Sequence, residues 1–494
     1  MEQATAVAEP TALRSVRNYV AGEWVDATST GTLDSRDPAT GDLLARVPLS
    51  GAADVDAAVR AARDAFAAWR GTSVVARARR LLVLRELLEQ HLDELAGLVT
   101  LDMGKTLPDA RGEVMRGIES VEAAAAAPHL LKGENLEGVA TGVDVELVRQ
   151  PVGVVAAVTP FNFPAMIPLW FLPYAVVCGN TLVLKPSEAD PLTSQRIFEL
   201  IHDAAVFPPG VVNLLHGAHD AVNGLLDHPD VDAVSFVGSA KTARLVSSRA
   251  AQQGKRVQAL GGAKNAMVVM PDADAGLLAK GVTSSAFGAA GQRCLAGSLA
   301  VLVGTKEEQD GSRDVIVEAA RALRTGPGAD AATDVCPLVS VAARERVESE
   351  IELALETGAE LVLDGRRDGG PGGAELGPTV VDNAPLDSRA VQEELFGPVL
   401  VLLRAPDLAG ALELVNASRY GNASVIFTSS GGAARQYRYG VEAGMVGVNI
   451  GVAAPVAWFP FAGWGDSFDG DMHANGRDAF EFYTRKKVVT SRWA

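Results

Sequence analysis

Apolar residues recur at helical spacing in the first hundred positions of the chain. One predicted helix carries its apolar residues three or four positions apart, so that they share a face. These are Val55, Ala58, Val59, Ala62, Phe66 and Trp69. A second predicted helix carries a leucine stripe at Leu81, Leu84, Leu88, Leu92 and Leu95. Before both, Tyr19–Val25 predicts a hairpin with Gly22 at its tip, and residues 1–15, which lack periodicity, predict a loose tail.

From about residue 150 the pattern changes to short apolar runs that alternate with helical segments. The first runs are Val152–Val158, Thr181–Leu184, Val211–Leu215, Ala233–Val237 and Ala266–Met270. After a turn that enters a helix at residues 271–274, the later runs are Leu299–Val303, Val399–Leu403, Ser424–Thr428 and Val446–Ile450. Strands separated by helices are typical of parallel sheets. We therefore predict two α/β domains in series, joined near residues 258–265, with the glycine-rich stretch 365–373 as a surface hairpin loop.

Composition and charge narrow the class of protein. The chain has 494 residues, of which 48% are hydrophobic and 21% charged, as in globular proteins, which excludes disorder. A membrane span needs about 18–20 uninterrupted apolar residues, and the longest candidate, residues 163–184, is broken by prolines and glycine. The formal charge of −17 repels a phosphate backbone, so we expect no nucleic-acid partner. Three cysteines and no visible secretory signal favour a reducing, cytoplasmic compartment.

One of the three cysteines has the sequence surroundings of a nucleophile. Cys294 follows Arg293 in a segment of small residues, and a neighbouring positive charge lowers the pKa of a thiol. Cys178 lies in an apolar run and Cys336 lies beside Pro337, which predicts buried, inert thiols at both positions. The local sequence alone leaves catalysis and simple burial equally open for Cys294.

Two further segments follow predicted strands, at the edge where open α/β sheets bind ligands. Gly238 and Ser239 come between a strand and a helix, where free backbone N–H groups favour a phosphate. Lys185 and Glu188 follow the run that ends at Leu184. Taken singly, these residues are equally typical of a capped helix and of solvated charges.

Together, five segments resemble the motifs of the aldehyde dehydrogenase superfamily in their order and spacing. They are residues 159–164 (Thr-Pro-Phe-Asn-Phe-Pro), 185–188 (Lys-Pro-Ser-Glu), 236–239 (Phe-Val-Gly-Ser), 291–294 (Gly-Gln-Arg-Cys) and 393–398 (Glu-Glu-Leu-Phe-Gly-Pro). The resemblance extends from about residue 17 to the C-terminus. Within the superfamily, the segments most similar to the CoA-acylating methylmalonate-semialdehyde dehydrogenases are residues 166–170, 262–265 followed by 268–274, and 482–490.

The resemblance implies an aldehyde dehydrogenase-like α/β fold with two doubly wound domains and a small β flap for oligomerisation. Residues 1–133 and 151–258 are then the NAD-binding domain, and residues 259–445 the catalytic domain. Residues 134–150 and 476–494 form the flap, and residues 446–475 return to the NAD-binding domain and the substrate mouth. Relatives of this kind imply a homotetramer, a dimer of dimers.

The resemblance also implies a role for each residue of the motifs. Cys294 attacks the aldehyde, while Asn162 and the backbone N–H of Cys294 hold the developing oxyanion. The residues implied to contact NAD are Thr159, Phe161, Lys185, Ser187, Glu188, Gly238, Ser239, Glu394 and Phe396. Arg116 and Arg293 are the candidates to bind a substrate carboxylate. Glu188 favours NAD over NADP, since it repels a 2′-phosphate, and no metal is expected.

An absence points to coenzyme A. Hydrolytic relatives carry a glutamate as general base in the segment that corresponds to residues 258–264, where this chain has Ala259 or Leu260. General base catalysis accelerates a reaction by about 10²–10⁴-fold. Attack of water on the thioester would lose this acceleration here, whereas a thiol that is already partly ionised needs no base. We therefore expect NAD- and CoA-dependent oxidation of methylmalonate or malonate semialdehyde to propionyl-CoA or acetyl-CoA, with release of CO₂.

Two other functions stay open at this point. A remote carboxylate could replace the missing base and give a CoA-independent semialdehyde dehydrogenase that releases a free acid. A catalytically inactive binding protein is the other, although the retained motifs argue against it. Two departures from the relatives, Ala266 in place of a common histidine and the segment 459–468, leave the preferred acyl chain open.

Overall fold

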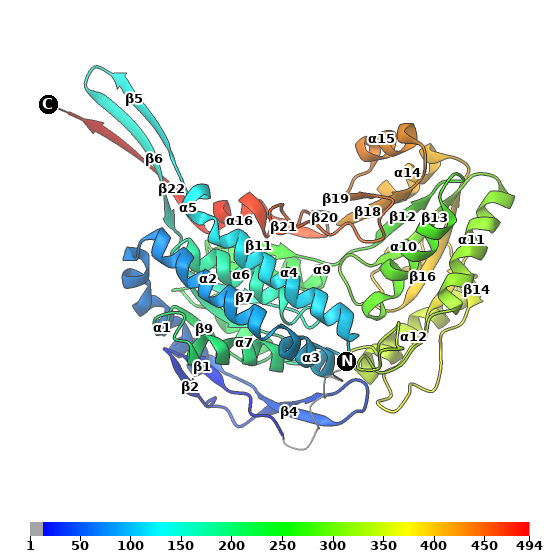
Figure 1. The fold of residues 1–494 in the computed structure, drawn as a ribbon, viewed down its shortest axis with the longest axis horizontal. Coiled ribbons are helices and arrows are strands. Elements are labelled where there is room, and N and C mark those ends of the chain that lie inside the picture. Colours follow the sequence, from blue (N-terminus) through cyan, green and yellow to red (C-terminus); the bar gives the residue numbers. More distant parts are fainter. Residues whose placement is uncertain (1–12, 494) are drawn as a thin grey trace, which may run out of the picture.

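The computed structural model describes residues 13–493 and forms two lobes, each built around one sheet (Figure 1). In the first lobe the strand order is β2-β1-β9-β8-β7-β10-β11-β21. These strands are β1 (Asn18–Val20), β2 (Glu23–Val25), β7 (Val154–Val158), β8 (Thr181–Lys185), β9 (Val212–Leu214), β10 (Ala233–Val237), β11 (Arg256–Leu260) and β21 (Phe468–Gly470). The helices of this lobe are α1 (Ala52–Gly71), α2 (Val74–Gln90), α3 (Leu92–Met103), α4 (Leu107–Ala125), α5 (Ala127–Leu130), α6 (Met166–Val177), α7 (Leu192–Asp203), α8 (His219–Asp227), α9 (Ala240–Gln252) and α16 (Gly476–Phe482).

The second lobe has the strand order β14-β15-β16-β13-β12-β18-β19. These strands are β12 (Asn265–Val269), β13 (Gly297–Val303), β14 (Glu360–Leu363), β15 (Thr379–Asp382), β16 (Val399–Ala405), β18 (Ala423–Phe427) and β19 (Met445–Val448). The helices are α10 (Ala275–Phe287), the 3₁₀ turn η1 (Gly288–Gly291), α11 (Lys306–Arg321), α12 (Val341–Glu356), α13 (Arg389–Gln392), α14 (Leu408–Asn416) and α15 (Gly431–Gly440). Only β14, at one edge, pairs antiparallel with its neighbour.

Helices cover both faces of the first sheet because its central strands are apolar on both sides. In β7, Val155 and Ala157 pack with residues of α2, α4 and α6, whereas Val154, Ala156 and Val158 pack with residues of α1, α8 and α9. β7, β8, β10 and β11 pair in parallel. Continuous apolar runs are typical of such doubly covered parallel sheets, and the predicted α/β fold class is confirmed.

A three-stranded sheet projects from the first lobe, with the C-terminus at its tip (Figure 1). Its strands are β5 (Glu134–Ala140), β6 (Val143–Pro151) and β22 (Thr484–Arg492). Two short antiparallel pairs complete the strands, the hairpin of β3 (Thr32–Arg36) with β4 (Leu43–Pro48), and the pairing of β17 (Tyr420–Gly421) with the distant β20 (Trp464–Gly465). The projecting sheet joins segments that are more than three hundred positions apart, since Thr484 pairs with Pro151 and Arg492 with Val143.

Two expectations about the N-terminal part need correction. The leucine stripe belongs to two helices, because α2 ends at Gln90 and α3 begins at Leu92. The five leucines are still buried, since both helices pack on the same core, and this is why their spacing did not reveal the break at His91. Of the predicted loose tail, residues 1–12 lie outside the described range, and Arg14 pairs with the β3–β4 hairpin through its N–H, 2.9 Å from the Leu44 carbonyl oxygen.

The chain passes from the first sheet to the second within a few residues, since β11 ends at Leu260 and β12 begins at Asn265. The predicted hairpin at Gly22 and the loop that joins β14 to β15 over residues 364–378 are both present. Within residues 13–493, none of the helices has the length and apolar character that crossing a membrane requires.

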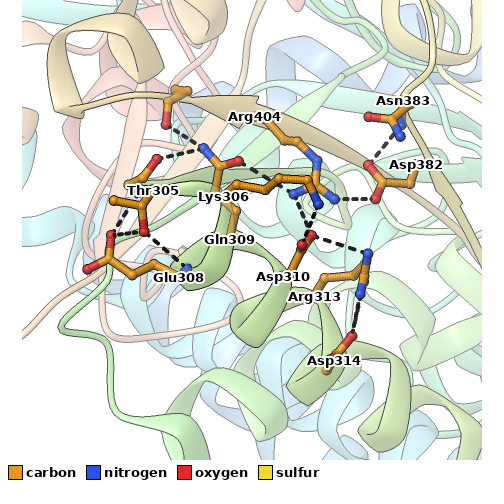
Figure 2. Close-up of polar contacts among 12 residues, drawn as sticks. Thr305, Lys306, Glu308, Gln309, Asp310, Arg313, Asp314, Asp382, Asn383 and Arg404 are labelled. Atoms are coloured by element: carbon orange, nitrogen blue, oxygen red, sulfur yellow. Dashed lines mark hydrogen bonds and ion pairs between the residues drawn. The ribbon is translucent and has the colours of Figure 1, made fainter.

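A polar network covers the carboxyl ends of β13, β15 and β16, at the start of α11 (Figure 2). Arg404 donates to Asp382 over 2.6 Å and to Asp310 over 3.1 Å. Gln309 donates over 2.9 Å to each of two main-chain carbonyls, those of Gly304 and Ala405. This edge of the second sheet is therefore closed by paired polar groups.

Candidate active site

Cys294 lies at the amino ends of the second sheet, on a main chain that is held from two sides. Its carbonyl oxygen accepts hydrogen bonds from the side-chain amides of Asn265 and Asn422, each over 2.8 Å. The preceding residues 289–291 all have positive φ, between 51° and 69°. Two of these three are alanines, for which this conformation is strained. The fold thus fixes the position of this thiol.

The electrostatic surroundings of Cys294 differ from the expectation. Burial, and next the negative charge of Glu394, raise the pKa of the Cys294 thiol to about 12. The guanidinium of Arg293 turns to the main chain of α10, where it donates to the carbonyls of Ser284 and Ser285. Its positive charge still lowers the thiol pKa, but desolvation outweighs it. Arg293 thus shifts the thiol pKa in the predicted direction, and the net shift is upward because the effect of burial is larger.

A cavity of about 260 Å³ opens beside Cys294. Its apolar lining includes Phe163, Met166, Trp170, Leu295 and Phe461. Its charged lining includes Asp109, Arg116, Glu119 and Arg293. Arg116 contacts Glu119 over 3.2 Å, and each of these side chains is 39% exposed. The structure therefore brings both predicted carboxylate-binding arginines to the wall of the cavity that holds the thiol.

Asn162 lies in the turn between β7 and α6 and is buried. Its Nδ2 donates to the main-chain carbonyl of Gln292 over 3.0 Å, two residues before Cys294. The side-chain oxygen of Gln292 in turn accepts the N–H of Val339 over 2.9 Å. The predicted oxyanion donor therefore lies against the loop that carries the thiol.

The carboxyl ends of β7, β8 and β10 lie at the edge of the first sheet from which the Asn162 turn contacts the Cys294 loop. The predicted residues at these ends are Thr159, Lys185, Ser187, Glu188, Gly238 and Ser239. Lys185 and Glu188 pair over 2.6 Å, and Ser239 caps α9 by accepting the N–H of Thr242. The hydroxyl of Thr159 is buried and has no hydrogen-bond partner among the described residues. An unpaired hydroxyl and a helix N-terminus suit a polar, phosphate-bearing ligand.

Glu394 and Phe396 of the second lobe lie against residues of the first lobe and of the link between the sheets. Phe396 has a φ of 54°, and its ring meets that of Phe161 edge-to-face with centroids 5.7 Å apart. Burial raises the pKa of Glu394 to about 7. Nearby, burial lowers the pKa of the Lys264 ammonium to about 8, and its Nζ has no partner in the described part of the chain. Buried groups with shifted pKa values mark this region as functional.

Sequence reasoning missed four residues of this region. Asn265 and Asn422 each stand directly before an apolar run, and a polar residue at the mouth of a buried strand was the available signal. Lys105 and Glu113, which form a buried ion pair beneath Asn162, have no such signal, because two charges eight positions apart look like a solvated surface.

Comparisons with known proteins agree with this arrangement. Residues 24–489 match the model of the Aldehyde dehydrogenase family. Malonate-semialdehyde dehydrogenase 1 of Geobacillus kaustophilus is 50% identical over 480 residues, which are 97% of this chain and 98% of that protein. A crystal structure of methylmalonate-semialdehyde dehydrogenase from Oceanimonas doudoroffii, 42% identical, superposes with a TM-score of 0.95 over 98% of this chain and 99% of that one. A Sinorhizobium meliloti protein assigned the same activity and crystallised with NAD, 41% identical, also gives a TM-score of 0.95, with the same coverage.

Proposed function

The chain belongs to the aldehyde dehydrogenase family, as its motifs predict, and we propose that it oxidises malonate or methylmalonate semialdehyde with NAD and transfers the acyl group to CoA. The products are acetyl-CoA or propionyl-CoA, CO₂ and NADH. The names of the Geobacillus and Oceanimonas proteins support the substrate class. The two arginines in the wall of the Cys294 cavity support it as well, because a semialdehyde acid carries a carboxylate.

The observation that carries the CoA-dependent reaction is the side chain at the end of β11. Where hydrolytic relatives have a glutamate, this chain has Ala259 or Leu260, and both are buried apolar side chains. Water attack on a thioester then lacks the base that supplies about 10²–10⁴-fold. A thiol that arrives partly ionised needs no such base, so CoA is the acyl acceptor.

One observation favours the CoA-independent alternative, in which water releases a free acid. Glu394 is a partly buried carboxyl that lies near the segment of the missing base, since a Cβ at Gly262 would lie 2.5 Å from its Oε2. Its pKa of about 7 suits a general base at neutral pH. In our proposal, Glu394 instead contacts the nicotinamide ribose, and turnover in the absence of CoA separates the two functions.

The residues at the carboxyl ends of the first sheet fit NAD. Lys185, Ser187 and Glu188 would hold the adenosine ribose, Gly238 and Ser239 the pyrophosphate, and Glu394 and Phe396 the nicotinamide ribose, with Thr159 and Phe161 beside it. The unpaired Thr159 hydroxyl supports this assignment. NAD, when bound, supplies a hydride acceptor. These side chains fix its orientation toward the thiol.

In the proposed mechanism, Cys294 loses its proton and its sulfur bonds to the aldehyde carbon. Asn162 Nδ2 and the Cys294 N–H donate to the oxygen that becomes negative. Loss of hydride turns the adduct into a thioester on Cys294. Arg116 holds the substrate carboxylate until it leaves as CO₂, and the carbanion that remains takes up a proton. Arg293 lines the same cavity, and its guanidinium would join Arg116 only by leaving the α10 carbonyls. The CoA thiolate then attacks the thioester carbon and Cys294 leaves as thiolate.

The assembly and compartment belong to the same proposal. β19 is the edge strand of its sheet and exposes Val446 and Val448. The projecting sheet exposes Leu136, Val139 and Val488. We infer that these surfaces meet between subunits of a homotetramer, because unpaired edges and apolar patches favour association. The three cysteines, all free, support a cytoplasmic enzyme. We also keep residues 1–133 and 151–258 as the NAD-binding domain, with residues 259–445 as the catalytic domain.

The test is NADH formation from malonate semialdehyde, methylmalonate semialdehyde and propanal, each with and without CoA. With CoA, we expect steady turnover of the semialdehydes and the appearance of acetyl-CoA or propionyl-CoA. Without CoA, we expect a single burst of about one NADH per active site, because the acyl group stays on Cys294. Steady turnover in CoA-free buffer with release of a free acid would establish the CoA-independent alternative.

A further inference from the structure

We propose that Lys105 and Glu113 form a positioning pair that holds the turn of Asn162 in its catalytic geometry, an inference that rests on the proposed function. Lys105 precedes α4 and Glu113 lies within it. Their side chains are 1% and 0% exposed, respectively, and form an ion pair. Glu113 opens the segment 113–118, which resembles the substrate-facing helix of the methylmalonate-semialdehyde dehydrogenases, but the resemblance assigns neither Glu113 nor Lys105 a role.

Lys105 contacts the turn at two consecutive residues, Asn162 and Phe163. Its Nζ donates to the main-chain oxygen of Asn162 over 2.6 Å. The same ammonium lies 3.7 Å from the centroid of the Phe163 ring, within the range of a cation–π contact. With Glu113 as its third partner, the ammonium leaves the Asn162 main chain little freedom to rotate.

Glu113 holds the other side of the same turn. Its Oε1 accepts the N–H groups of Ala165 and Met166, over 2.8 and 3.2 Å, where α6 begins. Its Oε2 pairs with Lys105. The pair therefore fixes the chain both at Asn162 and immediately after Phe163, so that the side-chain amide of Asn162 stays aimed at the Cys294 loop.

The pair also links the turn to the candidate carboxylate clamp. Arg116 lies one helical turn beyond Glu113 on α4, and both residues line the Cys294 cavity. α4 packs closely on α6, since a Cβ at Gly117 would lie 2.6 Å from a methyl carbon of Leu169. The oxyanion donor and the clamp are thus held as one unit.

Stability alone does not explain such a pair. A fully buried ion pair contributes little net stability, and apolar replacements of similar volume are often neutral or stabilising. Preorganised donors to a developing oxyanion, in contrast, gain from being fixed. A displacement of about 1 Å at a reacting group can lower the rate about 10²-fold. Side chains that fix the position of Asn162 can therefore have a large effect on the rate.

The experiment separates positioning from folding with two variants, Lys105→Met and the double variant Lys105→Met/Glu113→Gln. The double variant leaves no unpaired buried charge and keeps an acceptor for the N–H groups of Ala165 and Met166. We expect the single variant to lose both thermal stability and the NADH burst. We expect the double variant to regain its thermal midpoint while its burst rate stays about 10–100-fold below wild type. The KM for propanal, which has no carboxylate for the clamp to bind, and the Kd for NAD should stay unchanged.

A matched control removes another ion pair, that of Arg404 and Asp382 in the network of Figure 2. The variant Arg404→Met/Asp382→Asn should leave the burst rate unchanged at any thermal midpoint it shows, because this pair lies at the far edge of the second sheet. Recovery of the wild-type burst rate in Lys105→Met/Glu113→Gln would overturn the positioning role. The burst rate of every variant is measured with propanal and with malonate semialdehyde. If the wild-type enzyme oxidises propanal alone, the proposed substrate is contradicted, but the propanal burst rates still test the positioning role of the pair.

Discussion

The two sheets of this protein contribute opposite ends to the region around Cys294. The first sheet presents the carboxyl ends of β7, β8 and β10, followed by Thr159, Lys185 and Gly238. The second presents the amino ends of β12 and β18, where Asn265 and Asn422 hold the Cys294 main chain. Ligands of open α/β sheets bind at carboxyl ends. The second sheet departs from this rule, since its carboxyl ends carry the Arg404 network instead (Figure 2).

The two edges of the second sheet differ in whether their buried polar groups have hydrogen-bond partners. At the closed edge, Arg404 and Gln309 have partners for their polar groups. On the side of Cys294, the Lys264 ammonium and, in the first lobe, the Thr159 hydroxyl are buried without a partner in the described residues. A buried polar group without a partner costs about 1–3 kcal/mol. We infer that the first sheet binds the cofactor, the amino edge of the second does the chemistry, and its closed edge serves the fold.

The substitution with the largest expected effect should abolish the reaction and leave cofactor binding intact. Cys294→Ser keeps the shape of the side chain but removes the thiolate nucleophile. We expect NADH formation to fall by about 10³-fold or more, while the Kd for NAD, measured by fluorescence titration, changes little because the first sheet is intact. Cys178→Ser is the control, since Cys178 is buried in the first lobe. Loss of turnover in Cys178→Ser rather than in Cys294→Ser would show that the wrong thiol was assigned.

The second effect concerns the protonation of the same thiol. Because the pKa of Cys294 is raised to about 12, the thiolate fraction rises with pH throughout the range below that value. The rate of alkylation by iodoacetamide in the absence of cofactor should therefore increase about 100-fold from pH 7 to pH 9, without a plateau. Cys178 and Cys336 are buried and do not compete. A plateau near pH 7 would mean that the charge of Arg293 outweighs desolvation after all.

The sequence predicts most strands of both sheets because they are continuous apolar runs, and those of the central strands are buried on both faces. It does not predict β11, where Gln258 interrupts the run. This glutamine is fully buried and donates to the hydroxyls of Ser235 and Tyr483, over 2.7 and 3.1 Å. Tyr483 is 225 positions away, so no local pattern shows that Gln258 has a partner. The break at His91 is hidden for a similar reason, since the leucines on either side pack on one core.

The same limit applies to the candidate site. The motif residues could be named from the sequence, because each lies at a strand end or in a segment that resembles the family. The pKa of Cys294 could not, since it depends on burial and on Glu394, one hundred positions later. The Lys105–Glu113 pair could not either, because its significance depends on contacts with Asn162 and Ala165. Side chains that act through packing across lobes leave no periodic signal.

The smallest effect tests how the first lobe contributes to substrate choice. Arg116 belongs to α4 of the first lobe but faces the cavity of a thiol held by the second. Arg116 pairs with Glu119, and the side chains of both residues are half-exposed. Ion pairs between exposed side chains are weak. The guanidinium is therefore available to a substrate carboxylate, which its planar fork binds bidentately.

We expect Arg116→Leu to raise the KM for malonate and methylmalonate semialdehyde by about 10–100-fold, as for loss of a charged hydrogen bond, and to leave propanal oxidation nearly unchanged. Glu119→Gln is the matched control on the same helix. It should keep or lower the KM for the acids, because it removes a competing negative charge while Arg116 remains. Equal losses for charged and uncharged aldehydes in Arg116→Leu would instead show that this arginine acts through the packing of α4. The first lobe would then supply the cofactor site and the Asn162 turn, but not the selection of the substrate carboxylate.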